Sequence, residues 1–307
     1  MGWANATFRK STNNTSHAHA SSGTLLGVIV FVTENHHKNG FKKKFPNPCF
    51  TLGAVKFIVT VFLTVDSVFA EPDLMKFETK IQEIIPRTSD ITSFRFPRPS
   101  NLTYKPGQFF FVAIKQGEKE LNKHFSFSSS PTQTGFIEFT KRLTDHEYSM
   151  ALKAAKVGDW ARIDAPYGEF TFEGEYPKIA LLAGGIGITP FISICKNATD
   201  KALPSQITLF FGCRTDNDIP FRRELKDIQQ ANKNLRLHIV INQPSDAWKG
   251  ATGNITADMI KKELPDYKDN VFYCCGPPGM VTAMEALIDS IGLPKNQLKL
   301  EYFTGYA

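Results

Sequence analysis

The spacing of hydrophobic and polar positions changes once along this chain, near Lys178. From Met75 to about Phe172, short apolar runs alternate with turn residues such as Gly107 and Gly158, a pattern typical of a small antiparallel β-barrel. The expected strands cover residues 76–85, 91–96, 108–114, 124–129, 136–141 and 160–164, with one helix near residues 147–155. The pattern therefore predicts a barrel domain over residues 75–173.

After Lys178, apolar runs of strand length alternate with helical segments. Strands are expected at residues 179–182, 207–211, 235–241, 271–274 and 299–303, and helices at residues 190–197, 221–231, 256–263 and 279–291. This alternation predicts a doubly wound, mostly parallel α/β domain over residues 178–307, after a linker near residues 173–177. Ligands of such sheets bind beyond the carboxyl ends of the strands.

Residues 1–74 resemble neither pattern and are rich in Ser, Thr, Asn and His. An apolar run at residues 51–65 is too short and too charged for a transmembrane helix. The lysines at 42–44, this run and the triplet at 68–70 resemble a signal peptide, although residues 1–41 are too long for its usual start. The alternative is that Met75 begins the protein and residues 1–74 are an extension. The sequence leaves both interpretations open.

Composition narrows the class of protein. A chain of 307 residues that is 42% hydrophobic, with 26 Phe, can bury the cores of two domains. The net charge of +6 is spread along the chain, so we expect no nucleic-acid partner. The five cysteines form no C-x-x-C pair, so we expect no metal site or disulfide scaffold, and a cytoplasmic location for the enzyme portion. Membrane association or export remains open through residues 42–70.

The glycine-rich stretch at residues 181–191 is the strongest local signal. An apolar strand ends in Gly184, Gly185 and Gly187, and a helix then restarts, with Thr189 expected as its N-cap and Pro190 as its first residue. A strand, a glycine turn and a helix N-terminus together form a typical phosphate-binding site. An ordinary tight turn would give the same pattern, so this stretch alone does not decide the function.

Four stretches in order carry a family resemblance: residues 123–126, 184–190 and 275–278, and Glu301-Tyr302-Phe303. Together they resemble the ferredoxin–NADP reductase-like family of flavoenzymes, over about residues 76–303. The resemblance implies a flavin-binding barrel followed by a nucleotide-binding α/β domain, with FAD and either NADPH or NADH as cofactors.

In that family an R-x-[YF]-S segment holds the flavin. The resemblance implies that Phe125 packs on the isoalloxazine ring and that Ser126 forms a hydrogen bond near its N5 atom. Lys123 stands where the family has arginine, and lysine cannot form the bidentate fork. The same segment adds His124 and Phe127 to the implied flavin site. Ser149 matches the family residue that binds the flavin pyrophosphate, although His146 replaces the usual glycine.

The resemblance also implies a nicotinamide-nucleotide site. Cys275 would lie beside the nicotinamide, and Glu301 and Phe303 would approach the flavin, with Tyr306 as a rival to Phe303. Ser126, Cys275 and Glu301 are the implied catalytic residues. The implied nucleotide-binding residues are Gly184, Gly185, Gly187, Thr189, Pro190, Gly276 and Pro277.

The choice between NADPH and NADH depends on residues after the second strand of the α/β domain. Arg214, Arg222 and Arg223 are cations suited to a 2′-phosphate and slightly favour NADPH. Asp216 and Asp218 are close enough to reverse that preference.

The leading hypothesis is a reductase that transfers hydride from NAD(P)H to FAD and electrons onward to a separate acceptor, such as ferredoxin or another small redox protein. One alternative is the electron-transfer subunit of a larger complex. The other is a flavin- or nucleotide-binding module without turnover, which Lys123 and the missing glycine at His146 suggest.

Overall fold

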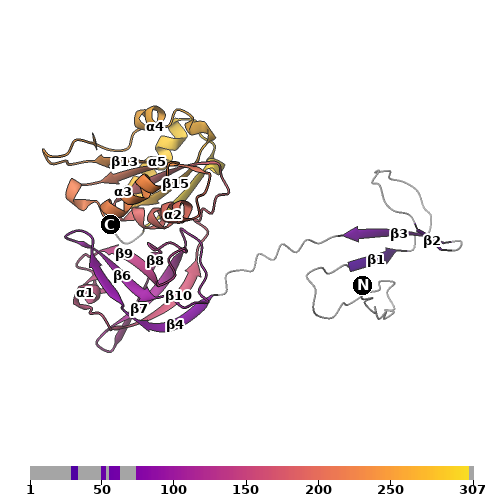
Figure 1. Ribbon diagram of the computed structural model, residues 1–307, viewed down its shortest axis with the longest axis horizontal. Helices are drawn as coiled ribbons and strands as arrows, with labels where there is room; N and C mark the ends of the chain where they lie inside the picture. Colours follow the sequence, from indigo (N-terminus) through magenta and orange to yellow (C-terminus); the bar gives the residue numbers. More distant parts are fainter. Residues whose placement is uncertain (1–28, 34–49, 53–54, 63–73, 304–307) are drawn as a thin grey trace. The chain divides into compact units, whose positions relative to one another are not determined.

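The structure, a computed structural model, describes residues 29–33, 50–52, 55–62 and 74–303, and it divides into two units, residues 1–71 and 72–307 (Figure 1). In the first unit an antiparallel sheet of order β1-β3-β2 is formed by β1 (Ile29–Thr33), β2 (Phe50–Leu52) and β3 (Val55–Phe62). The apolar run at residues 51–65 therefore contributes strands. The triplet at 68–70 lies outside the described residues.

None of the helices in the described ranges is long and apolar enough to cross a membrane.

The barrel domain contains two antiparallel sheets, of order β4-β10-β7-β8 and β5-β6-β9. Its elements are β4 (Met75–Lys80), β5 (Glu83–Pro86), β6 (Ile91–Pro97), β7 (Phe109–Gln116), β8 (Lys119–Ser126), β9 (Phe136–Arg142), α1 (Glu147–Ala154) and β10 (Trp160–Tyr167). The sheets contact each other through β8 with β9 and β4 with β6. The antiparallel fold expected for this half is confirmed.

Two predicted strand boundaries in the barrel are wrong, because the chain changes sheets there. The strand expected at residues 76–85 is divided at Ile81 and Gln82, whose N–H groups donate to the carbonyls of Asp159, directly before β10, and of Arg95 in β6. The strand expected at residues 124–129 begins at Lys119 and ends at Ser126. Both segments have the composition of a strand throughout. Composition alone could therefore not reveal where the chain changes the strand with which it pairs.

Aromatic side chains fill the barrel. Phe127 is fully buried and stacks on Tyr104 and Phe110, with ring centroids 3.9 and 4.3 Å away. The ring of Phe127 therefore does not line the barrel cavity, and its place in the flavin site stays a prediction. The chain has left β8 at Ser126, and Phe127 turns into the hydrophobic core, where burial of its ring is more favourable than exposure.

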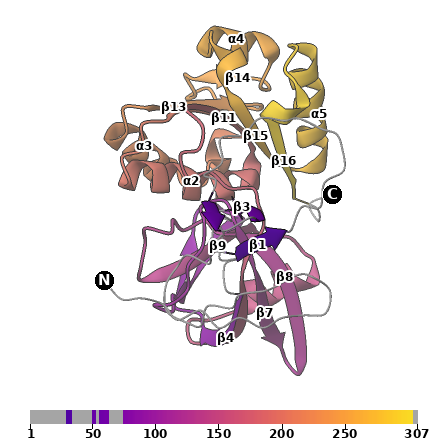
Figure 2. The same cartoon turned by 90° about the vertical axis from the view of Figure 1, so that its right-hand side faces the viewer.

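The α/β domain contains one parallel sheet, of order β14-β13-β12-β11-β15-β16 (Figure 2). Its elements are β11 (Lys178–Gly184), α2 (Thr189–Asp200), β12 (Gln206–Cys213), α3 (Arg222–Ala231), β13 (Leu235–Ile241), β14 (Ala251–Thr252), α4 (Ala257–Glu263), β15 (Val271–Gly276), α5 (Pro278–Ser290) and β16 (Leu298–Tyr302). Residues of α2 and α3 belong to one hydrophobic core, and residues of α4 and α5 to another. The predicted doubly wound fold is confirmed.

The glycine turn begins with a short 3-10 helix, η1 (Gly185–Ile188). Thr189 is therefore not the N-cap expected from the sequence. It is the first residue of α2, and its hydroxyl donates back to the carbonyl of Ile186 at 3.2 Å. A Cβ at Gly187 would lie 2.3 Å from the carbonyl oxygen of Cys275. Gly187 therefore allows β15 to approach the turn closely, which explains its place in the motif.

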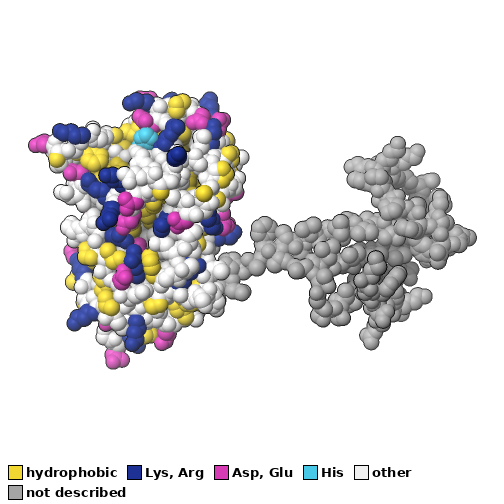
Figure 3. All heavy atoms as spheres, viewed as in Figure 1, with side chains coloured by type: hydrophobic (Ala, Val, Ile, Leu, Met, Phe, Trp, Pro, Cys, Tyr) yellow, Lys and Arg dark blue, Asp and Glu magenta, His cyan; other side chains and the backbone are white. Residues whose placement is uncertain are grey.

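Polar contacts join the barrel to the α/β domain. Arg87 donates to Glu138 of the barrel and to Glu224 of α3, and its guanidinium lies 4.6 Å from the ring centroid of Phe221. Ser193 of α2 donates to the carbonyl of Ser129 at 2.7 Å. Figure 3 shows positive and negative side chains side by side along this junction. The glycine turn also packs on the barrel, because η1 contacts β9.

Candidate functional site

Two cavities lie where the barrel meets the carboxyl edge of the parallel sheet. The barrel cavity, about 820 Å³, is lined by residues of β8, β9 and α1 and by Glu301, Tyr302 and Phe303. The sheet cavity, about 850 Å³, is lined by the glycine turn, the loops after β12 and β13, and α5. Both volumes are typical of small-molecule and cofactor sites. His146 lines both cavities, so they meet at the N-terminus of α1.

Aromatic and hydroxyl groups form one wall of the barrel cavity. Phe125 stacks on Phe139 at a centroid distance of 4.3 Å, which fixes its ring at the cavity surface. Ser126 also lines this wall, and its hydroxyl is buried and has no hydrogen-bond partner among the described residues. A buried hydroxyl without a partner is costly, so a ligand that accepts its hydrogen bond would bind here.

The same wall also holds basic side chains. Lys123 and Lys141 both line it, and Lys141 lies with its Nζ 5.9 Å from the Phe125 ring centroid. Burial, with a smaller contribution from Lys123, lowers the pKa of Lys141 to about 8. The same two causes, in the same order, lower the pKa of His124. An anionic ligand bound beside these groups would stabilise their charged forms, in a cavity that Glu120 and Glu147 also line.

The N-terminus of α1 closes the side of the barrel cavity next to the sheet cavity. Its N-cap is His146, whose side chain makes no capping hydrogen bond. Ser149 is fully buried, with its hydroxyl 3.3 Å from that of Thr144. Unpaired N–H groups at a helix start, next to hydroxyls and lysines, suit a phosphate group.

A carboxyl–thiol pair lies where β15 and β16 end. Cys275 is fully buried and its thiol donates to Glu301 at 3.9 Å. Burial raises the pKa of Glu301 to about 7, and the thiol of Cys275 partly opposes this rise. Burial, followed by the charge of Glu301, raises the pKa of the Cys275 thiol well above its usual range. Cys275 is thus a neutral thiol that donates a hydrogen bond to Glu301 and does not itself line either cavity.

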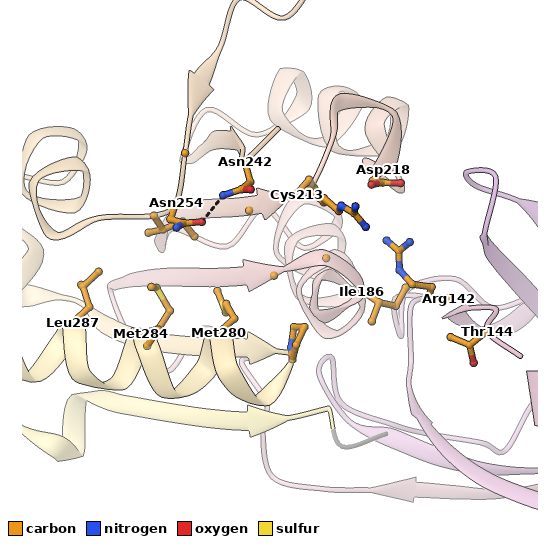
Figure 4. A pocket seen from close by; sticks show the side chains of 18 of the residues that line it. Arg142, Thr144, Ile186, Cys213, Asp218, Asn242, Asn254, Met280, Met284 and Leu287 are labelled. Atoms are coloured by element: carbon orange, nitrogen blue, oxygen red, sulfur yellow. Dashed lines mark hydrogen bonds between the residues drawn. The ribbon is translucent and has the colours of Figure 1, made fainter. Parts of the chain in front are cut away.

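The sheet cavity combines a polar end with an apolar end (Figure 4). Arg214 and Asp218 line the polar end, beside the glycine turn, and Asn242 donates to Asn254 at 3.0 Å on the adjoining loops. The apolar end is lined along α5 by Met280, Met284 and Leu287. An elongated ligand with a charged portion and flat apolar groups fits this arrangement.

The predicted site residues divide into three groups. Those brought to a cavity wall are Lys123, His124, Phe125, Ser126, Ser149, Gly184, Gly185, Thr189, Arg214, Pro277, Glu301 and Phe303. Those that pack behind the walls are Phe127, Gly187, Pro190, Cys275 and Gly276. Tyr306 lies outside the described residues.

Comparison with known proteins gives two adjacent family matches. Residues 77–172 match the oxidoreductase FAD-binding domain, and residues 181–286 match the oxidoreductase NAD-binding domain. An NADH-cytochrome b5 reductase 1 of Ajellomyces capsulatus is 30% identical over 244 residues, which cover 75% of this chain and 78% of that protein. The chain belongs to the ferredoxin–NADP reductase-like family.

Two further relatives support the assignment to this reductase family. The glycine betaine monooxygenase reductase subunit of Chromohalobacter salexigens is 30% identical, over 72% of this chain and 62% of that protein. A solved ferredoxin NADP⁺ reductase from Neisseria gonorrhoeae, with bound FAD and NADP, shares the fold, with a TM-score of 0.65 and 20% identity over 74% of this chain and 98% of that chain. The protein is an FAD-dependent NAD(P)H oxidoreductase, as predicted.

The sequence did not single out Lys141 and Arg142 of this reductase. They are consecutive residues at the end of β9, and successive side chains of a strand point to opposite sides. Lys141 lines the barrel cavity and Arg142 lines the sheet cavity. The sequence signal that could have indicated these two residues is a pair of adjacent basic residues at the end of a strand, a short loop before a helix.

Proposed function

We propose that this protein oxidises NADH in the sheet cavity, holds FAD in the barrel cavity and passes electrons to a separate one-electron redox protein. The observation that carries the proposal is the shared wall at His146. It brings the sheet cavity, beside the glycine turn, into contact with the barrel cavity, which Phe125 and two lysines line. FAD, when bound, supplies the ability to accept a hydride and release electrons singly. The residues of the chain bind the two cofactors, orient them toward each other and exclude water from the site.

We assign the barrel cavity residues to FAD. The ring of Phe125, held by Phe139, offers an aromatic surface for the flavin, and the unpartnered hydroxyl of Ser126 donates to it. The pyrophosphate suits Lys123, Ser149 and the N-terminus of α1, since each offers a cation or a hydrogen-bond donor. His124 completes the wall. Because Lys123 replaces the family arginine, its contribution is a point charge without the bidentate fork.

We assign the nucleotide to the sheet cavity. Gly185 leaves the turn open to a pyrophosphate, Gly184 makes room for Met280, and Pro277 begins the wall on the α5 side. Thr189 and Phe303 line the barrel cavity. Beside them, Glu301 stabilises the positive charge that develops on the nicotinamide during hydride transfer. Behind them Gly187, Pro190, Gly276 and Cys275 keep β15 tight against the turn.

Asp218 supports NADH as the donor. Its carboxylate lines the polar end of the sheet cavity with Arg214, whereas Arg222 donates to the carbonyl of Asp216 and Arg223 is 92% exposed at its side chain. The cations that favoured NADPH are therefore largely directed elsewhere, and a carboxylate repels a 2′-phosphate. The names of the related NADH-cytochrome b5 reductases agree with this assignment.

We expect kcat/KM to be higher for NADH than for NADPH, and we expect Asp218→Asn to narrow that ratio by about tenfold, a difference of about 1.4 kcal/mol in transition-state free energy. Steady-state kinetics with both nucleotides measure it. Arg223→Ala, which changes an exposed charge away from the cavity, is the control and should leave the ratio unchanged. An unchanged ratio in the Asp218 variant contradicts this role.

The acceptor is proposed from the relatives. Their names include NADH-cytochrome b5 reductases and the reductase components of oxygenases. We therefore propose a haem or iron–sulfur protein as acceptor. Mixing the reduced protein with cytochrome b5 or with a [2Fe–2S] ferredoxin, and following the acceptor's own absorbance, should show rapid reduction of one of them. Reduction of neither, with small-molecule acceptors still reduced, would contradict this choice.

We also propose that the unit formed by residues 72–307 acts in the cytoplasm, where NADH is available. Within the described ranges its cysteines at 195, 213, 274 and 275 are free and buried, which is typical of a reducing compartment.

A further inference from the structure

We propose that Arg142, a residue of the flavin barrel, binds the pyrophosphate of the nicotinamide nucleotide in the sheet cavity. The inference rests on the proposed function, in that a nicotinamide nucleotide occupies this cavity. It assigns to the barrel a direct role in nucleotide affinity, so that a complete nucleotide site requires both domains.

The position of Arg142 is the first argument. It is the last residue of β9, and β9 contacts η1, the turn at Gly185–Ile188. Figure 4 shows its side chain entering the sheet cavity from the barrel side, near Ile186 and directed toward the loop that bears Asp218. Arg142 therefore lies beside the glycine turn at which a dinucleotide pyrophosphate binds.

The charge balance of the cavity is the second argument. Among the described residues that line it, the guanidinium groups belong to Arg142 and Arg214 and the carboxylate to Asp218, with His146 at the edge. The turn and the first turn of α2 contain no basic residue. Asp90 pairs with Arg142 from outside the cavity, so the guanidinium groups of Arg142 and Arg214 are the positive charges that the described lining offers to a pyrophosphate.

The hydrogen-bonding state of Arg142 is the third argument. Its Nη1 donates to Asp90, an ion pair that anchors the side chain at the barrel surface. Its Nε and Nη2 donate to no acceptor in the described part of the chain. An anchored guanidinium with unused donors is suited to a phosphate, because little side-chain freedom is lost on binding.

The test measures binding of ADP and of adenosine to the FAD-containing protein by isothermal titration calorimetry. ADP carries a diphosphate and adenosine does not. We expect Arg142→Ala to weaken ADP binding about tenfold, and Arg142→Lys to give an intermediate affinity because lysine lacks the planar fork. Adenosine binding should not change in either variant. The matched control is Arg223→Ala, whose side chain is outside the cavity and should bind ADP like the wild type.

Wild-type affinity for ADP in both Arg142 variants would overturn the inference. Equal weakening of ADP and adenosine would also overturn it, because a distorted cavity affects both ligands. If Arg142→Ala does not fold, as shown by a lowered FAD content, the comparison of Arg142→Lys with the wild type decides. If the wild type itself binds neither ADP nor NADH, the proposed function fails, and the two failures are thereby distinguished.

Discussion

Ser126→Ala is expected to slow the reduction of bound FAD by NADH on the order of 10²-fold, the usual effect of removing one donor in a water-excluded site. Ser126 lines the barrel cavity, and its buried hydroxyl has no partner among the described residues, so its hydrogen bond is available to the flavin. FAD content should stay the same, because stacking on Phe125 and the pyrophosphate contacts remain. Stopped-flow absorbance measures the reduction rate.

Ser128→Ala provides a matched control two residues along the chain. Its hydroxyl is buried but donates to Glu138 at 2.8 Å and lies 2.9 Å from the hydroxyl of Thr140, and Ser128 itself does not line the cavity. We expect Ser128→Ala to lose about 1–3 kcal/mol of stability with little change in the rate of flavin reduction. Ser126→Ala should instead slow flavin reduction with little change in stability. If Ser126→Ala is reduced as fast as the wild type, the hydroxyl has a structural role only.

Glu301→Gln is expected to change how stability depends on pH in protein without bound flavin. Burial raises the pKa of Glu301 from 4.5 to about 7. Between these values the folded state holds a proton that the unfolded state has released, so stability falls as pH rises and the loss is complete above about pH 7. The full effect is about 3 kcal/mol, at about 1.4 kcal/mol for each pH unit. Gln has no such loss.

Denaturant unfolding of both proteins at pH 4 and pH 8 measures this difference. The variant should be more stable than the wild type at pH 8 and similar to it at pH 4. For catalysis the opposite preference is expected, because an ionised Glu301 stabilises positive charge that develops on the nicotinamide. Flavin reduction should therefore speed up about tenfold as pH rises through 7 in the wild type, and stay flat in Glu301→Gln. Parallel pH profiles of the two proteins would exclude Glu301 from this role.

The sequence predicted the architecture well because periodicity reports burial directly. The change near Lys178 separates antiparallel strands from a parallel sheet, and most elements lie within a few residues of their expected positions. The wrong strand boundaries arise where local composition does not indicate which strands pair with each other. The segment 76–85 changes sheets at Ile81, and the segment 124–129 leaves β8 at Ser126.

The site was predictable where a motif combines several residue types, and not where it depends on contacts between distant segments. Phe125, Ser126 and the glycine turn came from local patterns. Arg142 came only from the structure, because β9 and η1 are separated along the chain by α1, β10 and β11 and meet through the packing of two domains. Cys275 came from a motif, but only its burial shows that its thiol acts on Glu301.

The most direct test of the account is the visible absorbance spectrum of the purified protein before and after NADH is added without oxygen. The account predicts a yellow protein whose flavin absorbance bleaches on addition of NADH and returns when an electron acceptor is supplied. A protein that stays colourless after incubation with FAD would contradict the assignment of the barrel cavity. A yellow protein that neither NADH nor NADPH bleaches would contradict the proposed reductase activity.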